Sequence, residues 1–228
     1  MVDHKTPSLI TLPIELTYRI MDNLDAEALC CSFRDVSTRT NAIMDTYEPY
    51  KRMSKLKFCF RGIRTNEVEP LVAALKASST LKILDLFSNK IDSDGVSYFC
   101  EALETNETLT ELSLQSNHVS NTGVLCLAET LLMNQTLTKL NLSTNHIDDD
   151  GAQYLAEALK FNITLTELKL DYNKISDQGA QYFADALKVN MTLKLLELYS
   201  NNIDHAGELH FKEALKVNNV VKIKGLSL

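Results

Sequence analysis

The sequence lacks an excess of positive charge, because 23 Lys and Arg stand against 30 Asp and Glu and the formal net charge is -7. General nucleic-acid binding depends on clustered cations that displace counterions, so the composition argues against it. The chain also lacks an uninterrupted apolar run of about 18 residues, which a membrane-spanning helix needs, and its first residues lack the pattern of a secretory signal. We therefore expect a cytoplasmic or nuclear protein with no nucleic-acid and no membrane partner.

Motifs that carry enzyme chemistry are also missing. The five cysteines are an odd number without metal-ligand spacing, so free thiols are expected. No nucleophile, base and orienting group recur at a usable spacing, and there is no glycine-rich phosphate loop. The acidic stretch from His146 to Gly151 does not space its carboxylates as a calcium loop does; we interpret Asp148 as a helix cap and Asp149 and Asp150 as partners of the helix dipole. No enzymatic activity and no cofactor are expected.

What the sequence does contain is a repeat of 28 residues. Each unit opens with the pattern L-x-x-L-x-L-x-x-N-x-(I/V), and a period of this size indicates a solenoid. The opening leucines are Leu81, Leu109, Leu137, Leu165 and Leu193. An incomplete match precedes them from Met53 and another follows from Val221. We therefore predict a solenoid over residues 53–228, with about six repeats and a terminal half-repeat.

Each unit predicts one short strand and one helix. Leu140 and Leu142 alternate with polar neighbours, which is typical of a strand with one buried face. An apolar stripe at i, i+3, i+4 and i+7 follows, as from Ala152 to Leu159, and predicts a helix that buries this stripe. One repeat position before the helix always holds a residue type that caps helices. These expected caps are Asp92, Ser120, Asp148, Ser176 and Asp204.

An asparagine row and the stacking distances complete the predicted fold. The row follows the strands, where a side-chain amide satisfies buried backbone groups; its members are Asn89, Asn117, Asn145, Asn173 and Asn201. Stacked strands lie about 4.8 Å apart and packed helices about 8 to 10 Å apart, so the parallel sheet must curve with the strands inside. These motifs resemble the leucine-rich repeats of the ribonuclease-inhibitor class, also seen in NOD-like receptors. The resemblance implies an α/β leucine-rich-repeat horseshoe with a protein-binding surface.

The strand positions that point away from the helices are the candidate target-binding residues. They alternate with the buried leucines and form the concave face of the predicted horseshoe. They are Phe87, Glu111, Gln115, Lys139, Asn141, Glu167, Lys169, Asp171, Tyr172, Leu195, Glu197 and Tyr199. Exposed aromatic residues in this set are typical interface anchors, and cross-strand packing explains them equally well.

Two further clusters have more than one interpretation. Cations without an intervening acid are typical either of a protected edge strand or of a contact for an acidic partner, and they gather at Lys51, Arg52, Lys55, Lys57, Arg61 and Arg64. His118 and His146 share one repeat position and are expected to stack about 5 Å apart. A third metal ligand is missing and Lys90 and Lys174 continue the row, so we expect no metal there.

The segment before the repeats has a pattern of its own. It begins with L-P-x-E-L at Leu12 and ends with V-S-x-R and Tyr50-Lys51. This segment, residues 12–52, resembles an F-box, a three-helix module that docks on the Skp adaptor of cullin-based ubiquitin ligases. The resemblance implies adaptor contacts at Leu12, Pro13, Ile14, Leu16, Ile20, Leu24, Val36, Tyr47 and Tyr50. Residues 1–11 are predicted to be a flexible N-terminus.

Two functional hypotheses follow. In the first, the protein is a non-catalytic substrate-recognition subunit of a Skp-cullin-F-box ubiquitin ligase: residues 12–52 bind the Skp adaptor, and the concave face binds an unidentified protein target. The alternative is a stand-alone binding, inhibitory or sensor horseshoe whose N-terminal helices only cap the solenoid. Leu16 and Ile20 are exposed in the first hypothesis and buried in the second.

The last unit of the sequence departs from the repeat. Lys224 falls at an inner leucine position, which indicates either a terminal cap, whose lysines discourage edge pairing, or a truncated product. Glu208 and Lys212 replace small apolar residues in the preceding helix and favour a genuine end.

Overall fold

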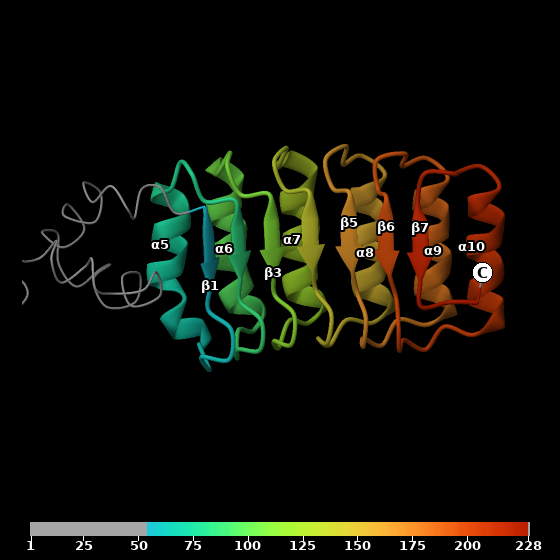
Figure 1. The fold of residues 1–228 in the computed structure, drawn as a ribbon. Helices are drawn as coiled ribbons and strands as arrows, with labels where there is room; N and C mark the ends of the chain where they lie inside the picture. The colour runs from blue at the N-terminus through green and yellow to red at the C-terminus, as the bar shows by residue number, and fades with distance from the viewer. Residues whose placement is uncertain (1–53, 228) are drawn as a thin grey trace, which may run out of the picture.

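The computed structural model describes residues 54–227, and within them a single parallel sheet runs the length of the molecule (Figure 1). Its strands follow one another in sequence order. They are β1 (Lys55–Lys57), β2 (Ile83–Asp85), β3 (Glu111–Ser113), β4 (Lys139–Asn141), β5 (Glu167–Lys169), β6 (Leu195–Glu197) and β7 (Lys222–Lys224). The predicted alternation of strand and helix is confirmed, and the fold is a leucine-rich-repeat α/β fold.

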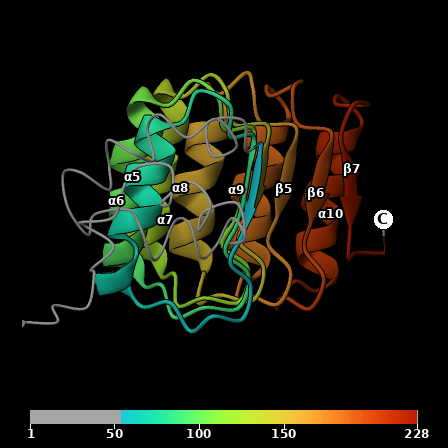
Figure 2. The same ribbon diagram turned by 60° about the vertical axis from the view of Figure 1, so that its left-hand side comes forward.

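The helices form a second layer that covers one face of the sheet (Figures 1 and 2). They are α5 (Glu69–Ala77), α6 (Ser93–Thr105), α7 (Asn121–Met133), α8 (Asp149–Leu159), α9 (Asp177–Leu187) and α10 (His205–Leu215), and a short 3-10 turn, η2 (Thr65–Glu67), precedes α5. No helix within residues 54–227 is long and apolar enough to cross a membrane. The difference between strand and helix spacing curves the stack toward the sheet, so the uncovered strand face is the concave one.

The core lies between the two layers and is built from the repeated leucines. Leu140 and Leu142 of one unit are buried together with Leu155 and Leu159 of its helix. Equivalent strand leucines meet in register, as Leu112 does with Leu140. Because every unit buries the same positions against its neighbours, the apolar face that no single repeat could cover becomes one continuous core.

The register changes at the last strand. Leu196 pairs with Ile223, and Glu197 pairs with Lys224. The prediction that Lys224 occupies an inner leucine position is therefore wrong. One residue fewer separates Val221 from its strand than in the earlier units, so Ile223 takes the inner position and Lys224 turns to the concave face.

The predicted asparagine row binds backbone groups of neighbouring repeats. The Asn145 amide donates to the carbonyl oxygens of Leu114 and Leu142, both at 3.0 Å, and its oxygen accepts from the Val119 N–H at 3.0 Å. A second row, which the sequence analysis did not interpret, does the same where helices return to strands. It consists of Asn106, Asn134, Asn162, Asn190 and Asn218, all buried. The two asparagine rows thus supply hydrogen bonds to buried backbone groups at both turns of each repeat, from strand to helix and from helix to strand.

The helix caps differ from expectation at one position. The side chains of Asp92, Asp148, Ser176 and Asp204 accept from first-turn N–H groups as predicted. Ser120 makes no such bond, because its hydroxyl pairs with the Ser93 hydroxyl of the preceding repeat at 2.7 Å. Asp149 also has a further role: it accepts from the N–H groups of Ser176 at 2.7 Å and Gly179 at 2.9 Å. These contacts tie each helix start to its neighbour.

Candidate functional site

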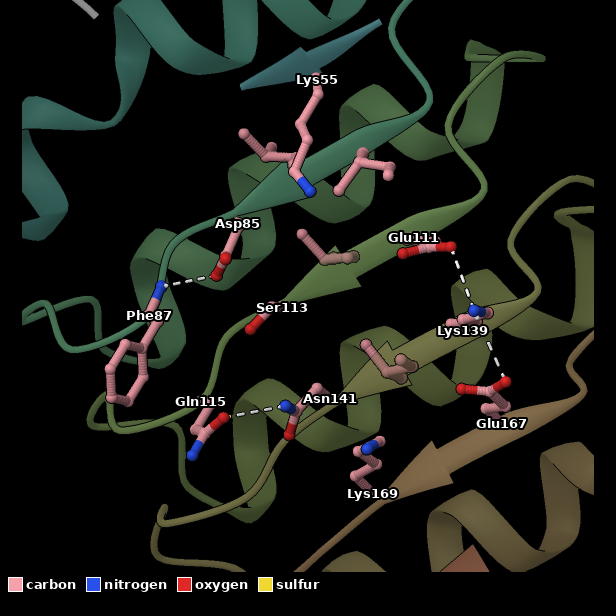
Figure 3. A pocket seen from close by; sticks show the side chains of 14 residues that line it. Lys55, Asp85, Phe87, Glu111, Ser113, Gln115, Lys139, Asn141, Glu167 and Lys169 are labelled. Atoms are coloured by element: carbon pink, nitrogen blue, oxygen red, sulfur yellow. Dashed lines mark hydrogen bonds and ion pairs between the residues drawn. The ribbon is translucent and has the colours of Figure 1, made fainter. Parts of the chain in front are cut away.

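The concave face carries a hollow of about 380 Å³ over strands β2 to β5 (Figure 3). Its floor is the sheet itself at the positions of Leu84, Leu112 and Leu140, whose side chains are buried toward the helices, and charged, polar and aromatic side chains of the neighbouring positions surround it. Seven predicted target-binding residues line it: Phe87, Glu111, Gln115, Lys139, Asn141, Glu167 and Lys169. The repeat brings them together because residues 28 apart in sequence lie side by side on adjacent strands.

A lysine between two glutamates crosses the middle of the hollow. The Lys139 Nζ lies 3.2 Å from a Glu111 carboxylate oxygen and 3.5 Å from one of Glu167. The Glu111 hydrogen bond, followed by the charges of both carboxylates, raises the pKa of Lys139. All three side chains remain about a third or more exposed. The ion pairs therefore fix the positions of these three side chains relative to one another while leaving them accessible to a partner.

Glu197 is also on this face, but its carboxylate is already engaged. It lies 2.8 Å from the Lys169 Nζ and 2.6 Å from the Lys224 Nζ, and its side chain is only 9% exposed. Burial acts to raise the pKa of Glu197, whereas the hydrogen bonds from the two lysines lower it, and the lysines prevail. Glu197 therefore joins β5, β6 and β7, and the two lysines present the accessible charge.

The remaining predicted residues lie beside the hollow. Asp171 is half-buried and accepts from the Tyr199 N–H at 2.9 Å, and this burial raises its pKa. Tyr172 is 63% exposed at a turn with a positive φ of 53°, so it belongs to the loop after β5. Tyr199 is 48% exposed, and Leu195 is partly buried on β6. These four extend the candidate surface toward the C-terminal repeats.

Besides the inner leucines, four residues of the hollow were not among the predicted target-binding residues: Ile83, Asp85, Ser113 and Lys55, of which Lys55 was noted only in the cationic cluster. The signal was present, since Ile83 and Ser113 hold the same repeat positions as Glu111 and Asn141. Phe87 also has a neighbour that was not anticipated, because its ring packs edge-on against the Phe60 ring with centroids 4.7 Å apart.

The stacked histidines lie outside this hollow, on the loops that follow the strands. The His118 and His146 rings are nearly parallel with centroids 6.1 Å apart, close to the expected stacking. His118 also borders a shallow hollow with Arg64, Lys90 and Tyr98. No group of three or more metal-ligating side chains occurs within residues 54–227.

Residues 12–52 and the nine adaptor-contact residues predicted on them lie outside the described part of the chain. Of the six clustered cations, Lys55 and Lys57 lie on β1 and Arg61 and Arg64 follow it. The other two, Lys51 and Arg52, precede the described residues. Lys55 lines the hollow, which adds a positive charge to its N-terminal side.

Family models match the repeats directly. A model described as the TMOD/LMOD leucine-rich domain matches residues 96–175, and a leucine-rich-repeat model matches residues 77–100. The chain is built of leucine-rich repeats. No F-box was found in it, and no curated protein matched the sequence.

Two solved structures resemble these repeats. One, described as leiomodin-1 actin-binding site 2, is 22% identical, with a TM-score of 0.51, 80% of this chain covered and 90% of that chain. The other is the tropomodulin C-terminal domain of Caenorhabditis elegans, 15% identical, with a TM-score of 0.48, 86% of this chain covered and 94% of that chain. At these identities the likeness to leiomodin-1 concerns the fold.

Proposed function

We propose that this protein is a non-catalytic binding module that holds a protein partner on its concave face, across strands β2 to β5. The observation that carries the proposal is the hollow in which Lys139, flanked by Glu111 and Glu167, stays accessible on the concave side of the sheet. The ordered charges supply register, and the partly exposed aromatic ring of Phe87 supplies an anchor; protein interfaces need both. The stand-alone binding alternative is thus the one that the leucine-rich-repeat matches support.

The shape of the face favours a macromolecule over a small ligand. Small-molecule sites enclose most of their ligand, whereas this hollow is lined by four successive strands, and Tyr172 and Tyr199 are exposed beyond it on later repeats. The hydrogen-bonded sheet and the two asparagine rows hold the backbone of every unit. A partner therefore meets a preformed surface, and little ordering entropy is lost on binding.

Actin is the partner that we propose to test first. The TMOD/LMOD model matches residues 96–175, which include strands β3, β4 and β5 of the four strands beneath the hollow. One of the structures with a similar fold is described as an actin-binding site.

The test is a titration of fluorescently labelled monomeric actin with the full chain, followed by anisotropy. Lys139→Glu places three acids in a row and is expected to weaken binding about tenfold or more. Lys188→Glu is the matched control on the helical layer, where Lys188 pairs with Asp185, and it is expected to bind within about twofold of wild type. Absence of saturable binding rejects actin; equal losses in both variants reject the concave face.

The ubiquitin-ligase role stays a separate prediction, resting on the L-P-x-E-L pattern and the rest of residues 12–52. Its test is co-expression of the full chain with a Skp adaptor, followed by size-exclusion chromatography. Co-elution that is lost in a folded Leu16→Asp, Ile20→Asp variant would support adaptor binding. A wild-type chain that never co-elutes would leave the stand-alone module as the function of the protein.

A further inference from the structure

Helix α7 departs from the other repeats on the layer that faces away from the sheet. Leu125 stands where α6, α8 and α9 carry Ser97, Gln153 and Gln181, and it is 37% exposed. Leu132 stands where the other units carry a charged residue, and it is 51% exposed. Apolar residues recur at the buried positions of each repeat because they form the core. Leu125 and Leu132 are not buried, so packing of the core does not account for a leucine at either position.

Leu132 also takes the place of a lysine that forms an ion pair with a glutamate or aspartate in the later repeats. In α8 the Lys160 Nζ lies 2.6 Å from the Glu157 carboxylate, and α9 and α10 repeat this pair with Lys188 and Asp185 and with Lys216 and Glu213. In α7 the acid is kept as Glu129, but leucine replaces the lysine. Within residues 54–227, Glu129 has no ion pair. One change of residue therefore leaves both an exposed leucine and an uncompensated carboxylate.

These departures line a groove between α7 and α8, which are adjacent in Figure 1. The groove has a volume of about 230 Å³. Its walls are apolar apart from two acids: Leu125, Ala128, Glu129, Leu132, Tyr154, Glu157, Ala158 and Phe161. Of the two acids, Glu157 is held by Lys160. Glu129 thus contributes the free negative charge of the groove.

The apolar surface continues from the groove onto the loops that join helices to strands. Phe161, which lines the groove, is 72% exposed, and Met133 at the end of α7 and the loop residue Ile163 are each 76% exposed. The next loop adds Val189 at 61% and Met191 at 46%. An exposed apolar surface of this extent marks an interaction site more often than a solvated face.

We propose that this groove binds a basic amphipathic helix of a protein partner. An apolar groove between two helices accommodates the apolar face of a third helix, and Glu129 is placed to accept a Lys or Arg at its border. Glu104, at the position in α6 equivalent to Leu132, and Glu107 after it are both exposed and form no ion pair within residues 54–227. The N-terminal border of the groove therefore selects a cationic partner helix over an anionic one.

The probe is a fluorescent helical peptide of about 18 residues, or five turns, with leucines at i, i+3, i+4 and i+7 and lysines beside them. Two comparison peptides carry glutamates in place of the lysines, or the same residues in an order that breaks the apolar face. Binding to the full chain is followed by anisotropy. The lysine peptide is expected to bind saturably, and about tenfold or more tightly than either comparison peptide.

Variants taken from the repeat itself locate the site without disturbing the fold. Leu132→Lys and Leu125→Gln introduce residues that α8 and α9 carry at these positions, and each is expected to weaken peptide binding about tenfold. Leu209→Gln is the matched control, because Leu209 occupies the Leu125 position in α10, is 48% exposed and lies outside the groove. It is expected to leave the affinity within about twofold. Thermal unfolding of each variant verifies that the fold is kept.

Glu129→Gln tests the charge separately, and it is expected to remove most of the preference for the lysine peptide over its glutamate counterpart. The proposal is overturned if wild type does not bind the lysine peptide, or if Leu132→Lys binds it as wild type does. Sedimentation velocity adds one more outcome. A wild-type dimer that Leu132→Lys converts to a monomer would assign the groove to a second copy of this chain and overturn the proposed occupant.

Discussion

Lys169 on β5 and Glu197 on β6 form an ion pair of 2.8 Å across neighbouring strands. Lys224 of β7 approaches the same carboxylate from the other side at 2.6 Å. The side-chain exposure of Glu197 is 9%, so this pairing replaces water that the carboxylate has lost. The charges of the concave face are therefore structural as well as available for recognition, and the two roles can be separated by mutation.

Glu197→Gln is expected to lower the free energy of unfolding by about 1–3 kcal/mol at pH 7, because two lysines lose a charged partner. The two lysines lower the pKa of Glu197 below its unfolded value. The stabilisation is then present above an unfolded pKa of about 4.3 and is lost as the pH falls through the lower folded pKa. Urea unfolding between pH 7 and strongly acidic pH tests both statements.

The control for this prediction is Glu213→Gln, which removes an exposed pair with Lys216 on α10. Its effect is expected to stay below about 1 kcal/mol. A similar loss in both variants, or a Glu197→Gln effect that grows as the pH falls below about 4, would contradict the assignment.

Adjacent asparagines provide a second prediction. Asn218 is fully buried; its amide donates to the carbonyl oxygens of Leu187 at 2.8 Å and Asn190 at 2.7 Å. Asn219 is exposed. Asn218→Ala is expected to lower the free energy of unfolding by about 2–4 kcal/mol, because buried backbone carbonyls lose their donors, whereas Asn219→Ala should change it by less than about 0.5 kcal/mol. Chemical denaturation of the two variants measures both effects. Equal effects would contradict the stabilising role of the second asparagine row.

Two glycines with positive φ separate backbone strain from steric overlap. At Gly62 (φ +68°) an added Cβ meets nothing within 4 Å, whereas at Gly225 (φ +96°) it overlaps backbone atoms of Leu198 and Tyr199. Gly62→Ala is expected to cost about 1–2 kcal/mol through strain alone. Gly225→Ala is expected to cost about 1–3 kcal/mol more, because overpacking adds to the strain. Thermal unfolding measures the difference between the two variants. Equal losses of stability would show that the backbone at Gly225 shifts away from Leu198 and Tyr199 without cost.

The repeat made most of the fold predictable. The 28-residue spacing of the leucines fixes which residues become neighbours, so the strands, the helices and the pairing of Leu112 with Leu140 follow from it. A regular spacing of 28 residues does not predict the loss of one residue within the last unit. The shorter approach to Ile223 shifts the last strand by one residue, and only the closing of the core around Ile223 reveals this.

The candidate site was predicted in part, for a related reason. Strand alternation finds the side of the sheet on which Glu111 and Lys139 lie. It does not show that Glu197 is covered by two lysines, because Lys224 reaches it only through the shifted register. Asp149 was likewise interpreted within its own helix, whereas its hydrogen bonds go to the next repeat.

Hydroxyl-radical footprinting of the full chain, with and without saturating monomeric actin, would show directly whether actin binds the concave face. Phe87 and Tyr199 share one repeat position on the concave side, and Phe161 is 72% exposed on the helical side. We expect actin to protect Phe87 and Tyr199 from oxidation and to leave Phe161 unchanged. Protection of Phe161 without protection of Phe87, or no saturable complex at all, would contradict this prediction.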